Sequence, residues 1–196
     1  MMDTPERFIV GISGSTGAVY GVRLLEILSE RFPEIETHAI VSHGARATIE
    51  YELGRSAEDV LAMASVVHDD NNLGAAIASG TFITRGMVVA PCSIKTLGAL
   101  ATCRNDNLIT RAGDVCLKER RRLVLVVRET PLHLGHLRLM TTVTESGAVV
   151  LPPSPAFYHR PHTIADLVDH TVVKILDVFG LHVSDLIDRW EGLDHD

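Results

Sequence analysis

The sequence lacks any apolar run of the roughly 18 residues that a membrane-spanning helix needs. Its three cysteines, Cys92, Cys103 and Cys116, form no C-x-x-C pair, and their odd number argues against a disulfide framework. The first residues include Asp3 and Glu6, whereas a secretion signal carries basic charge before its apolar stretch. These absences predict a cytoplasmic protein that does not enter a membrane.

Basic residues are outnumbered, with 18 Lys and Arg against 25 Asp and Glu and a net charge of −7. Nucleic-acid binding usually requires a basic surface, so nucleic acid is not an expected partner. The bases that are present concentrate at 118–122, with Arg111 and Arg128 nearby in the chain. A local cationic site in an acidic protein suits a small anionic ligand better than a polyanion.

Aromatic residues make up only 5% of the chain, yet 46% of it is hydrophobic and the mean hydropathy is +0.19. This somewhat apolar composition suggests that other subunits cover part of the surface. A length of 196 residues suits one domain with a continuous core. We expect that domain to have its core at about 7–181 and a polar tail at 182–196, because the sequence contains no repeat or linker.

Short apolar stretches alternate along the chain with stretches of helical periodicity. The uniformly apolar stretches predict strands at 8–12, 37–41, 86–90, 123–127 and 148–151, with Pro91 ending the third. Helical spacing predicts helices at 18–31, 45–53, 57–63, 94–101, 108–121, 133–146 and 164–179. This alternation predicts an α/β fold of the flavodoxin-like or Rossmann-like kind, in which helices cover both faces of a parallel sheet.

Four polar segments directly follow predicted strands, at residues 13–17, 42–43, 91–93 and 128–131. In open parallel sheets, ligands bind beyond the carboxyl ends of the strands. We therefore expect these four segments to lie along one edge of the sheet and to form the functional site together.

The first of these segments belongs to a glycine-rich loop, GISGSTG, at 11–17. Such a loop brings backbone and hydroxyl donors close to an oxyanion beside a helix N-terminus. Ala18 follows where a P-loop would have Gly-Lys-Ser/Thr, so nucleoside triphosphate hydrolysis is not indicated. Ser42 closes the second strand in place of an acid, which suits a monophosphate such as FMN better than a dinucleotide. A tight turn without a ligand is the alternative.

The remaining segments contain candidate ligands of a flavin and of a second anion. Ser93 opens a helix directly after a strand, and either meets the flavin or only caps that helix. Arg111 and Lys118 lie seven residues apart and share a helix face, where they could present two cations to one phosphate. Arg128 and Glu129 emerge together at a strand end, either as a functional pair or as a structural ion pair.

Histidines at H-x-x-H spacing occur twice, at 133 and 136 and at 159 and 162. No recognised set of cysteines or carboxylates accompanies them, so we interpret them as surface histidines. Asp69 and Asp70 likewise lack the repeated carboxylates of a magnesium–diphosphate motif. No metal is expected.

Five blocks occur in one order: GISGSTGAVYGVR from Gly11, PCSIKTL from Pro91, RAGDVCLKERR from Arg111, VRETPL from Val127 and PAFYHRP from Pro155. Together they closely resemble the UbiX-type flavin prenyltransferase family, over residues 8–181. The resemblance implies metal-independent transfer of a dimethylallyl group from dimethylallyl phosphate to N5 and C6 of reduced FMN. It also implies that a UbiD-type decarboxylase receives the prenylated FMN, and that the protein is a homododecamer with sites between subunits.

The resemblance further implies roles for individual residues. The implied FMN contacts are Gly14, Ser15, Thr16, Ser42, Ser93, Ile94, Lys95, Thr96 and Arg128. The implied prenyl-donor contacts are Tyr158, Lys174 and Trp190, and the implied catalytic residues are Arg111, Lys118, Glu129 and Glu52. The chain departs from the pattern in two places. Ser15-Thr16 replaces the Ala-Ser of many members, and Leu73 replaces an aromatic residue found in some, which alters the expected prenyl pocket.

Two other functions are considered beside this one. An FMN-dependent cysteine decarboxylase of the related family would show a Pro-Ala-Ser-Ala-Asn-Thr-like block, whereas this chain has PPSPAFY at 152–158. A non-catalytic flavin carrier would not need Arg111, Lys118 and Glu129.

Overall fold

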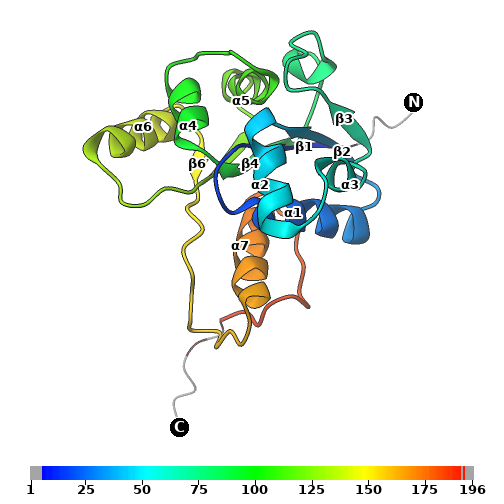
Figure 1. Cartoon of the computed structure of the whole chain (residues 1–196), viewed down its shortest axis with the longest axis vertical. Helices are drawn as coiled ribbons and strands as arrows, with labels where there is room; N and C mark the ends of the chain where they lie inside the picture. Colours follow the sequence, from blue (N-terminus) through cyan, green and yellow to red (C-terminus); the bar gives the residue numbers. More distant parts are fainter. Residues whose placement is uncertain (1–5, 191, 193–196) are drawn as a thin grey trace.

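A six-stranded parallel sheet forms the centre of the computed structural model, which describes residues 6–190 and 192 (Figure 1). Its strands are β1 (Arg7–Ile12), β2 (Glu36–Val41), β3 (Val66–His68), β4 (Gly86–Cys92), β5 (Arg122–Val127) and β6 (Val149–Val150). Their order is β3-β2-β1-β4-β5-β6, and every pairing is parallel. The order reverses between β1 and β4, and such a switch point is where open α/β sheets bind ligands.

Helices cover both faces of this sheet, as expected from the sequence. They are α1 (Ala18–Arg31), α2 (His43–Leu53), α3 (Ala57–Leu61), α4 (Ile94–Ala101), α5 (Leu108–Lys118), α6 (Leu134–Glu145) and α7 (Ile164–Val178), with a short 3₁₀ helix, η1 (Ala76–Ala78). One core packs α1, α2, α3 and α7 on the sheet, and the other packs η1, α4, α5 and α6. Phe8 and Val10 face the first core and Ile9 the second, because successive strand residues point to opposite faces.

Two features of the sheet differ from the expectation. Strand β3 was not expected, because three residues at the sheet edge carry little periodic signal. Strand β4 does not end at Pro91 but continues through it to Cys92, which pairs with Val127 after a shift in register. A proline is tolerated at such an irregularity because its missing N–H is not needed there.

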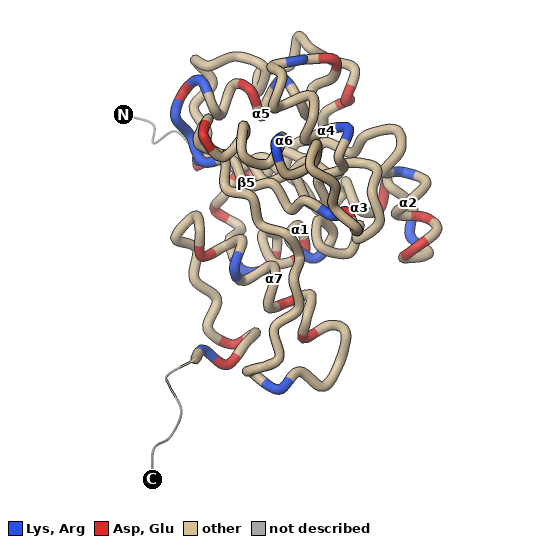
Figure 2. Tube along the Cα trace, turned by 90° about the vertical axis from the view of Figure 1, so that its left-hand side faces the viewer, with Lys and Arg blue, Asp and Glu red and all other residues tan. Residues whose placement is uncertain are grey.

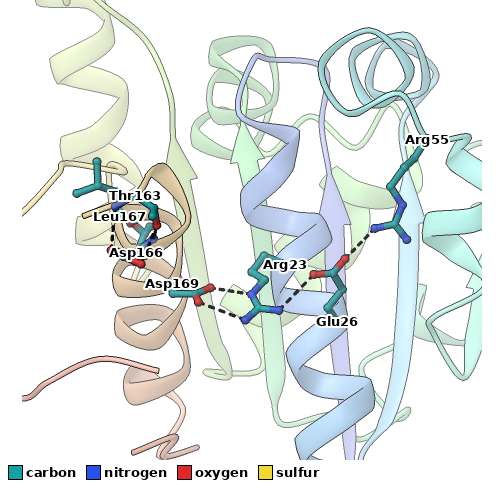
Figure 3. Close-up of polar contacts among 8 residues, drawn as sticks. Arg23, Glu26, Arg55, Thr163, Asp166, Leu167 and Asp169 are labelled. Atoms are coloured by element: carbon teal, nitrogen blue, oxygen red, sulfur yellow. Dashed lines mark hydrogen bonds and ion pairs between the residues drawn. The ribbon is translucent and has the colours of Figure 1, made fainter. Parts of the chain in front are cut away.

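Charged side chains join α1 to α7 and to the loop after α2 (Figure 3). Arg23 Nε lies 2.7 Å from Asp169 Oδ1, and Arg23 Nη1 lies 3.4 Å from Glu26 Oε2. Glu26 also pairs with Arg55 at 2.7 Å. A hollow of about 460 Å³ lies beside them, with Val19 and Ile164 among its lining residues. Because its charged groups are already paired with one another, we do not take this hollow as the functional site.

The segment between β6 and α7 and the segment after α7 run to the end of the molecule away from α4, α5 and α6 (Figures 1 and 2). We call these two segments, residues 151–163 and 181–190, the arm. Acidic and basic residues are interspersed along the chain (Figure 2). Within the described residues, no helix is long and apolar enough to cross a membrane.

Candidate functional site

The four polar segments lie along the carboxyl edge of the sheet, as expected from the sequence. Ser13 Oγ donates to the Pro91 carbonyl at 2.8 Å and accepts from the Ser93 N–H at 2.8 Å. The Arg128 N–H donates to the Cys92 carbonyl at 3.3 Å. These bonds join the loops after β1, β4 and β5. We call this edge the rim.

A cavity of about 410 Å³ opens at the rim, at the switch point between β1 and β4. Five of the residues that the family resemblance assigns to FMN line it: Gly14, Ser42, Ser93, Lys95 and Thr96. Ser15, Thr16, Ile94 and Arg128 are not among its lining residues, although Ser15 and Ile94 adjoin residues that are. A Cβ on Gly14 would lie 3.0 Å from the Gly44 backbone, so the two loops approach closely at a glycine.

Two serine hydroxyls cap helices beside the cavity. Ser42 Oγ accepts from the Ala45 N–H at 3.2 Å, and Ser93 Oγ accepts from the Thr96 N–H at 3.2 Å. A hydroxyl that accepts in this way keeps its own hydrogen for a second acceptor. Ser93 therefore caps α4 and also lines the cavity, so its two interpretations do not exclude each other.

Two buried polar atoms near the rim have no hydrogen-bond partner among the described residues. They are Ser15 Oγ and Arg128 Nε. Buried polar atoms are almost always hydrogen-bonded, so an unpartnered donor at a rim points to a ligand acceptor. In the described structure Arg128 also makes no ion pair with Glu129, whose Oε1 accepts from the Thr130 N–H at 2.9 Å. The structural ion-pair alternative for these two residues is therefore wrong.

Glu52 reaches the glycine-rich loop from the end of α2. Its Oε2 accepts from the N–H groups of Gly17 and Ala18 at 3.0 and 3.1 Å. Gly17, with a φ of 96°, precedes α1 and has no side chain to cap it. Glu52 supplies the missing acceptor, and its charge favours the positive end of the helix dipole.

Asp70, Asn107 and Thr110 also line the cavity, and none was proposed from the sequence. Asp70 accepts from the Ile109 N–H at 3.1 Å and from Asn107 Nδ2 at 2.9 Å. Burial raises the pKa of Asp70, against these hydrogen bonds, which lower it. Asp70 follows β3, so identifying that strand would have placed Asp70 at the rim.

Arg111 and Lys118 share one face of α5, as expected, but neither lines the cavity. Arg111 Nε donates to the Ala78 carbonyl at 3.1 Å, and Arg111 also pairs with Asp114. Lys118 pairs with Glu119 and would contact a Cβ at Gly80. Within one chain these cations face the segment before β4 rather than Glu129.

Tyr158 and Trp190 lie together on the arm, with ring centroids 5.8 Å apart. They line a hollow of about 340 Å³ that shares no lining residue with the rim cavity. Lys174 is exposed on α7, and Leu73 is 48% exposed.

His159 is not a surface histidine, as the sequence had suggested: both of its ring nitrogens are buried, and its ring stacks on His170.

Metal-binding and thiol chemistry find no support in the described part of the chain. Its His, Cys, Asp and Glu residues form no group of three or more that could hold a metal ion. Burial raises the pKa of the Cys92 and Cys116 thiols to about 12, so neither would ionise near neutral pH.

Comparisons with known proteins identify the family of this chain. The Flavoprotein family model matches residues 1–176. Flavin prenyltransferase UbiX from Thauera aromatica is 56% identical over 186 residues, which cover 95% of this chain and 94% of that protein. Two solved structures each have a TM-score of 0.92. One is a UbiX (AnUbiX, PadA1) in complex with FMN and dimethylallyl pyrophosphate, 46% identical, with 97% of this chain and 100% of that chain covered.

The other is a dodecameric FMN-dependent UbiX-like decarboxylase from Escherichia coli O157:H7, 47% identical, with 95% of this chain and 100% of that chain covered. Sequence identity of this level over nearly the whole length of both chains is found between members of one family. The chain belongs to the UbiX family of flavin prenyltransferases.

Proposed function

We propose that this protein transfers the dimethylallyl group of dimethylallyl phosphate to N5 and C6 of reduced FMN, without a metal. The observation that carries the proposal is the rim, where Ser42, Ser93 and Lys95 line a cavity. In the loops of the same rim, buried atoms of Ser15 and Arg128 have no hydrogen-bond partner among the described residues. Family membership supplies the reaction class.

The rim residues fit FMN. The Gly14 backbone and the hydroxyls of Ser15 and Thr16 would hold the phosphate, with Ser42 nearby. Residues 93–96 and Arg128 would hold the rest of the cofactor. When bound, reduced FMN supplies the nucleophilic nitrogen that receives the prenyl group. The chain's own contribution is to position the two reactants and exclude water.

Loss of phosphate from the donor requires fixed positive charge. Arg111, Lys118 and Lys174 would offset the charge that develops on the phosphate, and such electrostatic stabilisation is usually a large part of catalysis. Tyr158 and Trp190 would present π faces to the allylic group as it becomes cationic. Glu129 would move a proton to the leaving phosphate or from the flavin. Glu52 would be a further active-site carboxylate, held at the glycine-rich loop by its hydrogen bond from the Gly17 N–H.

One chain does not bring these groups to its own rim, because Lys118 lies at the end of α5 and Tyr158 lies on the arm. We therefore propose a homo-oligomer, a dodecamer like the Escherichia coli relative, in which copies complete each other's sites. The product would pass to a UbiD-type decarboxylase. A cytoplasmic location suits the three free cysteines, because the cytosol keeps thiols reduced.

The test is anaerobic incubation with reduced FMN and dimethylallyl phosphate, followed by mass spectrometry of the cofactor and activation of an apo-decarboxylase. We expect a mass gain of one prenyl group and a decarboxylase that becomes active. No mass gain would reject the transferase. Activation without a mass gain would instead identify a flavin carrier.

Lys118→Ala and Glu129→Gln should both retain FMN, because neither residue lines the rim cavity. Both should slow the transfer, because Lys118 would offset the charge on the phosphate and Glu129 would move a proton. The measurements are single-turnover rates and FMN affinity. Unchanged turnover in either variant would remove that residue from the proposed mechanism.

A further inference from the structure

His170 lies between the two side chains proposed to contact the prenyl donor. It precedes Lys174 by four residues on α7, so the two side chains share a helix face. Its Nε2 lies 2.9 Å from Tyr158 Oη, and the residue is only 8% exposed. Neither the sequence patterns nor the family resemblance pointed to this histidine.

Aromatic rings hold His170 and Tyr158 in place. The His159 ring stacks on His170 at 4.7 Å with an interplanar angle of 5°, and Tyr158 meets His170 edge-on at 5.7 Å. Trp190 meets Tyr158 edge-on at 5.8 Å. The contact between Tyr158 and His170 is therefore part of a packed cluster.

The tautomer of His170 decides where the Tyr158 hydrogen points, because a neutral ring carries its hydrogen on either Nδ1 or Nε2. Burial, together with His159 and Lys174, lowers the pKa of His170 below its usual 6.5, so the ring is neutral near pH 7. A neutral ring with its hydrogen on Nε2 donates to Tyr158 Oη. The phenol hydrogen is then free for a third atom, such as a phosphate oxygen, on the side of the hollow that Tyr158 lines.

We propose that His170 carries its hydrogen on Nε2 and is a positioning residue that orients the Tyr158 hydroxyl so that it donates to the phosphate of the prenyl donor, beside Lys174. This inference rests on the proposed function. The group it recognises is an alkyl phosphate, and His170 acts on that group only through Tyr158.

A double-mutant cycle tests the proposal in the full-length protein. The variants are His170→Phe, which keeps the stacked ring but loses the hydrogen bond, Tyr158→Phe, and the two combined. We expect His170→Phe to raise the KM for dimethylallyl phosphate about five- to tenfold, as for one lost hydrogen bond. It should add nothing in the Tyr158→Phe background. Additive effects in the double variant would overturn the proposal.

Two further variants guard against a folding defect in His170→Phe. His170→Gln places an amide donor near the position of Nε2 and should restore KM to within about twofold of wild type. His170→Asn is too short to reach Tyr158 and should behave like His170→Phe. If Gln is no better than Asn while both variants melt normally and retain FMN, His170 does not act through Tyr158.

A binding measurement separates this proposal from the transferase reaction. Trp190 is the only tryptophan of the chain and touches Tyr158, so its fluorescence should report dimethylallyl phosphate added with oxidised FMN. His170→Phe should weaken that binding about five- to tenfold, the same loss as in KM. This result would support the role of His170 even if wild type transferred no prenyl group. Equal binding by wild type and His170→Phe would overturn it.

Discussion

Ser13 and Ser15 lie two residues apart in one loop and have opposite hydrogen-bond states. Ser13 Oγ joins the Pro91 carbonyl to the Ser93 N–H, so it holds the loop after β1 on the end of β4. Ser15 Oγ is buried and bonds to no described residue. The first hydroxyl therefore serves the fold, whereas the second is available to a ligand.

Ser15→Ala should leave the stability of the free protein unchanged and weaken FMN binding about 10- to 100-fold, the scale of one hydrogen bond to a charged group. Flavin fluorescence titration and thermal unfolding measure the two effects. Ser13→Ala is the matched control, and should lower the free energy of unfolding by about 1–3 kcal/mol, because a buried N–H loses its acceptor. Equal FMN affinity in wild type and Ser15→Ala would show that this hydroxyl does not contact the cofactor.

Gly21 is a single residue at which the fold has no room for a side chain. It lies in α1, and a Cβ there would meet the Ala90 carbonyl oxygen at 2.1 Å and Ile12 Cγ1 at 2.9 Å. Real Cβ contacts are essentially never this short, and the nearest atom belongs to the backbone of β4. The glycine is therefore what allows α1 to pack against the centre of the sheet.

Gly21→Ala should lower the free energy of unfolding by about 1–3 kcal/mol, in spite of the higher helix propensity of alanine. Denaturant unfolding measures it. Gly98→Ala, in α4, is the control, because its Cβ would meet only Leu139 Cδ1 at 3.7 Å. That change should be neutral or stabilise by up to about 1 kcal/mol. Equal effects at both positions would refute the steric argument.

The contact between α1 and α7 illustrates how two elements far apart in the sequence are joined. Arg23 pairs with Asp169 through two hydrogen bonds, of 2.7 and 3.2 Å, and the two side chains are 28% and 16% exposed. Arg31, on the same helix, pairs with Asp185, but these side chains are 47% and 55% exposed. Exposed pairs are screened by water and contribute little, so the two ion pairs should differ in strength.

Arg23→Met should lower the free energy of unfolding by about 1 kcal/mol, because Asp169 loses its partner while the packing volume is kept. Arg31→Met should change it by less than about 0.5 kcal/mol. Urea unfolding of both variants at low and high salt provides the comparison. A larger loss at Arg31 than at Arg23 would contradict the ranking by burial.

At the scale of the whole molecule, the residues assigned to catalysis form three separate groups. The first surrounds the rim cavity, the second lies along α5 at Arg111 and Lys118, and the third lies on the arm at Tyr158 and Trp190. The structure of one chain therefore agrees with a site that is completed by other copies.

Mixed oligomers test whether different copies supply Lys118 and Glu129. Co-assembly of equal amounts of Lys118→Ala and Glu129→Gln should recover about a quarter of wild-type activity. A site that takes Lys118 from one copy and Glu129 from another is intact only when both copies supply the unmutated residue, which random mixing gives in about one site in four. Lys118→Ala with Arg111→Ala should recover nothing, since both residues lie on α5 of one copy. A particle mass near the 21.4 kDa of one chain, or no recovery in verified mixed particles, would contradict a shared site.

The fold class, most element positions and the location of the rim could be predicted from the sequence. Uniform apolar strands, such as Val10 and its neighbours, can only be buried on both faces, and polar residues at strand ends then share one edge. The five ordered blocks also indicated the family, because each is a motif of adjacent residues that is visible in the sequence itself.

Which side chains meet could not be predicted, because it depends on how the elements pack in three dimensions. The bond from Glu52 to Gly17, the contact of His170 with Tyr158 and the position of Asp70 at the rim join residues that are distant in the chain or follow an unpredicted strand. The separation of Lys118 from Glu129 also depends on how the elements that carry them pack. Such contacts depend on the packing of whole elements, and local periodicity does not encode the distance between two elements.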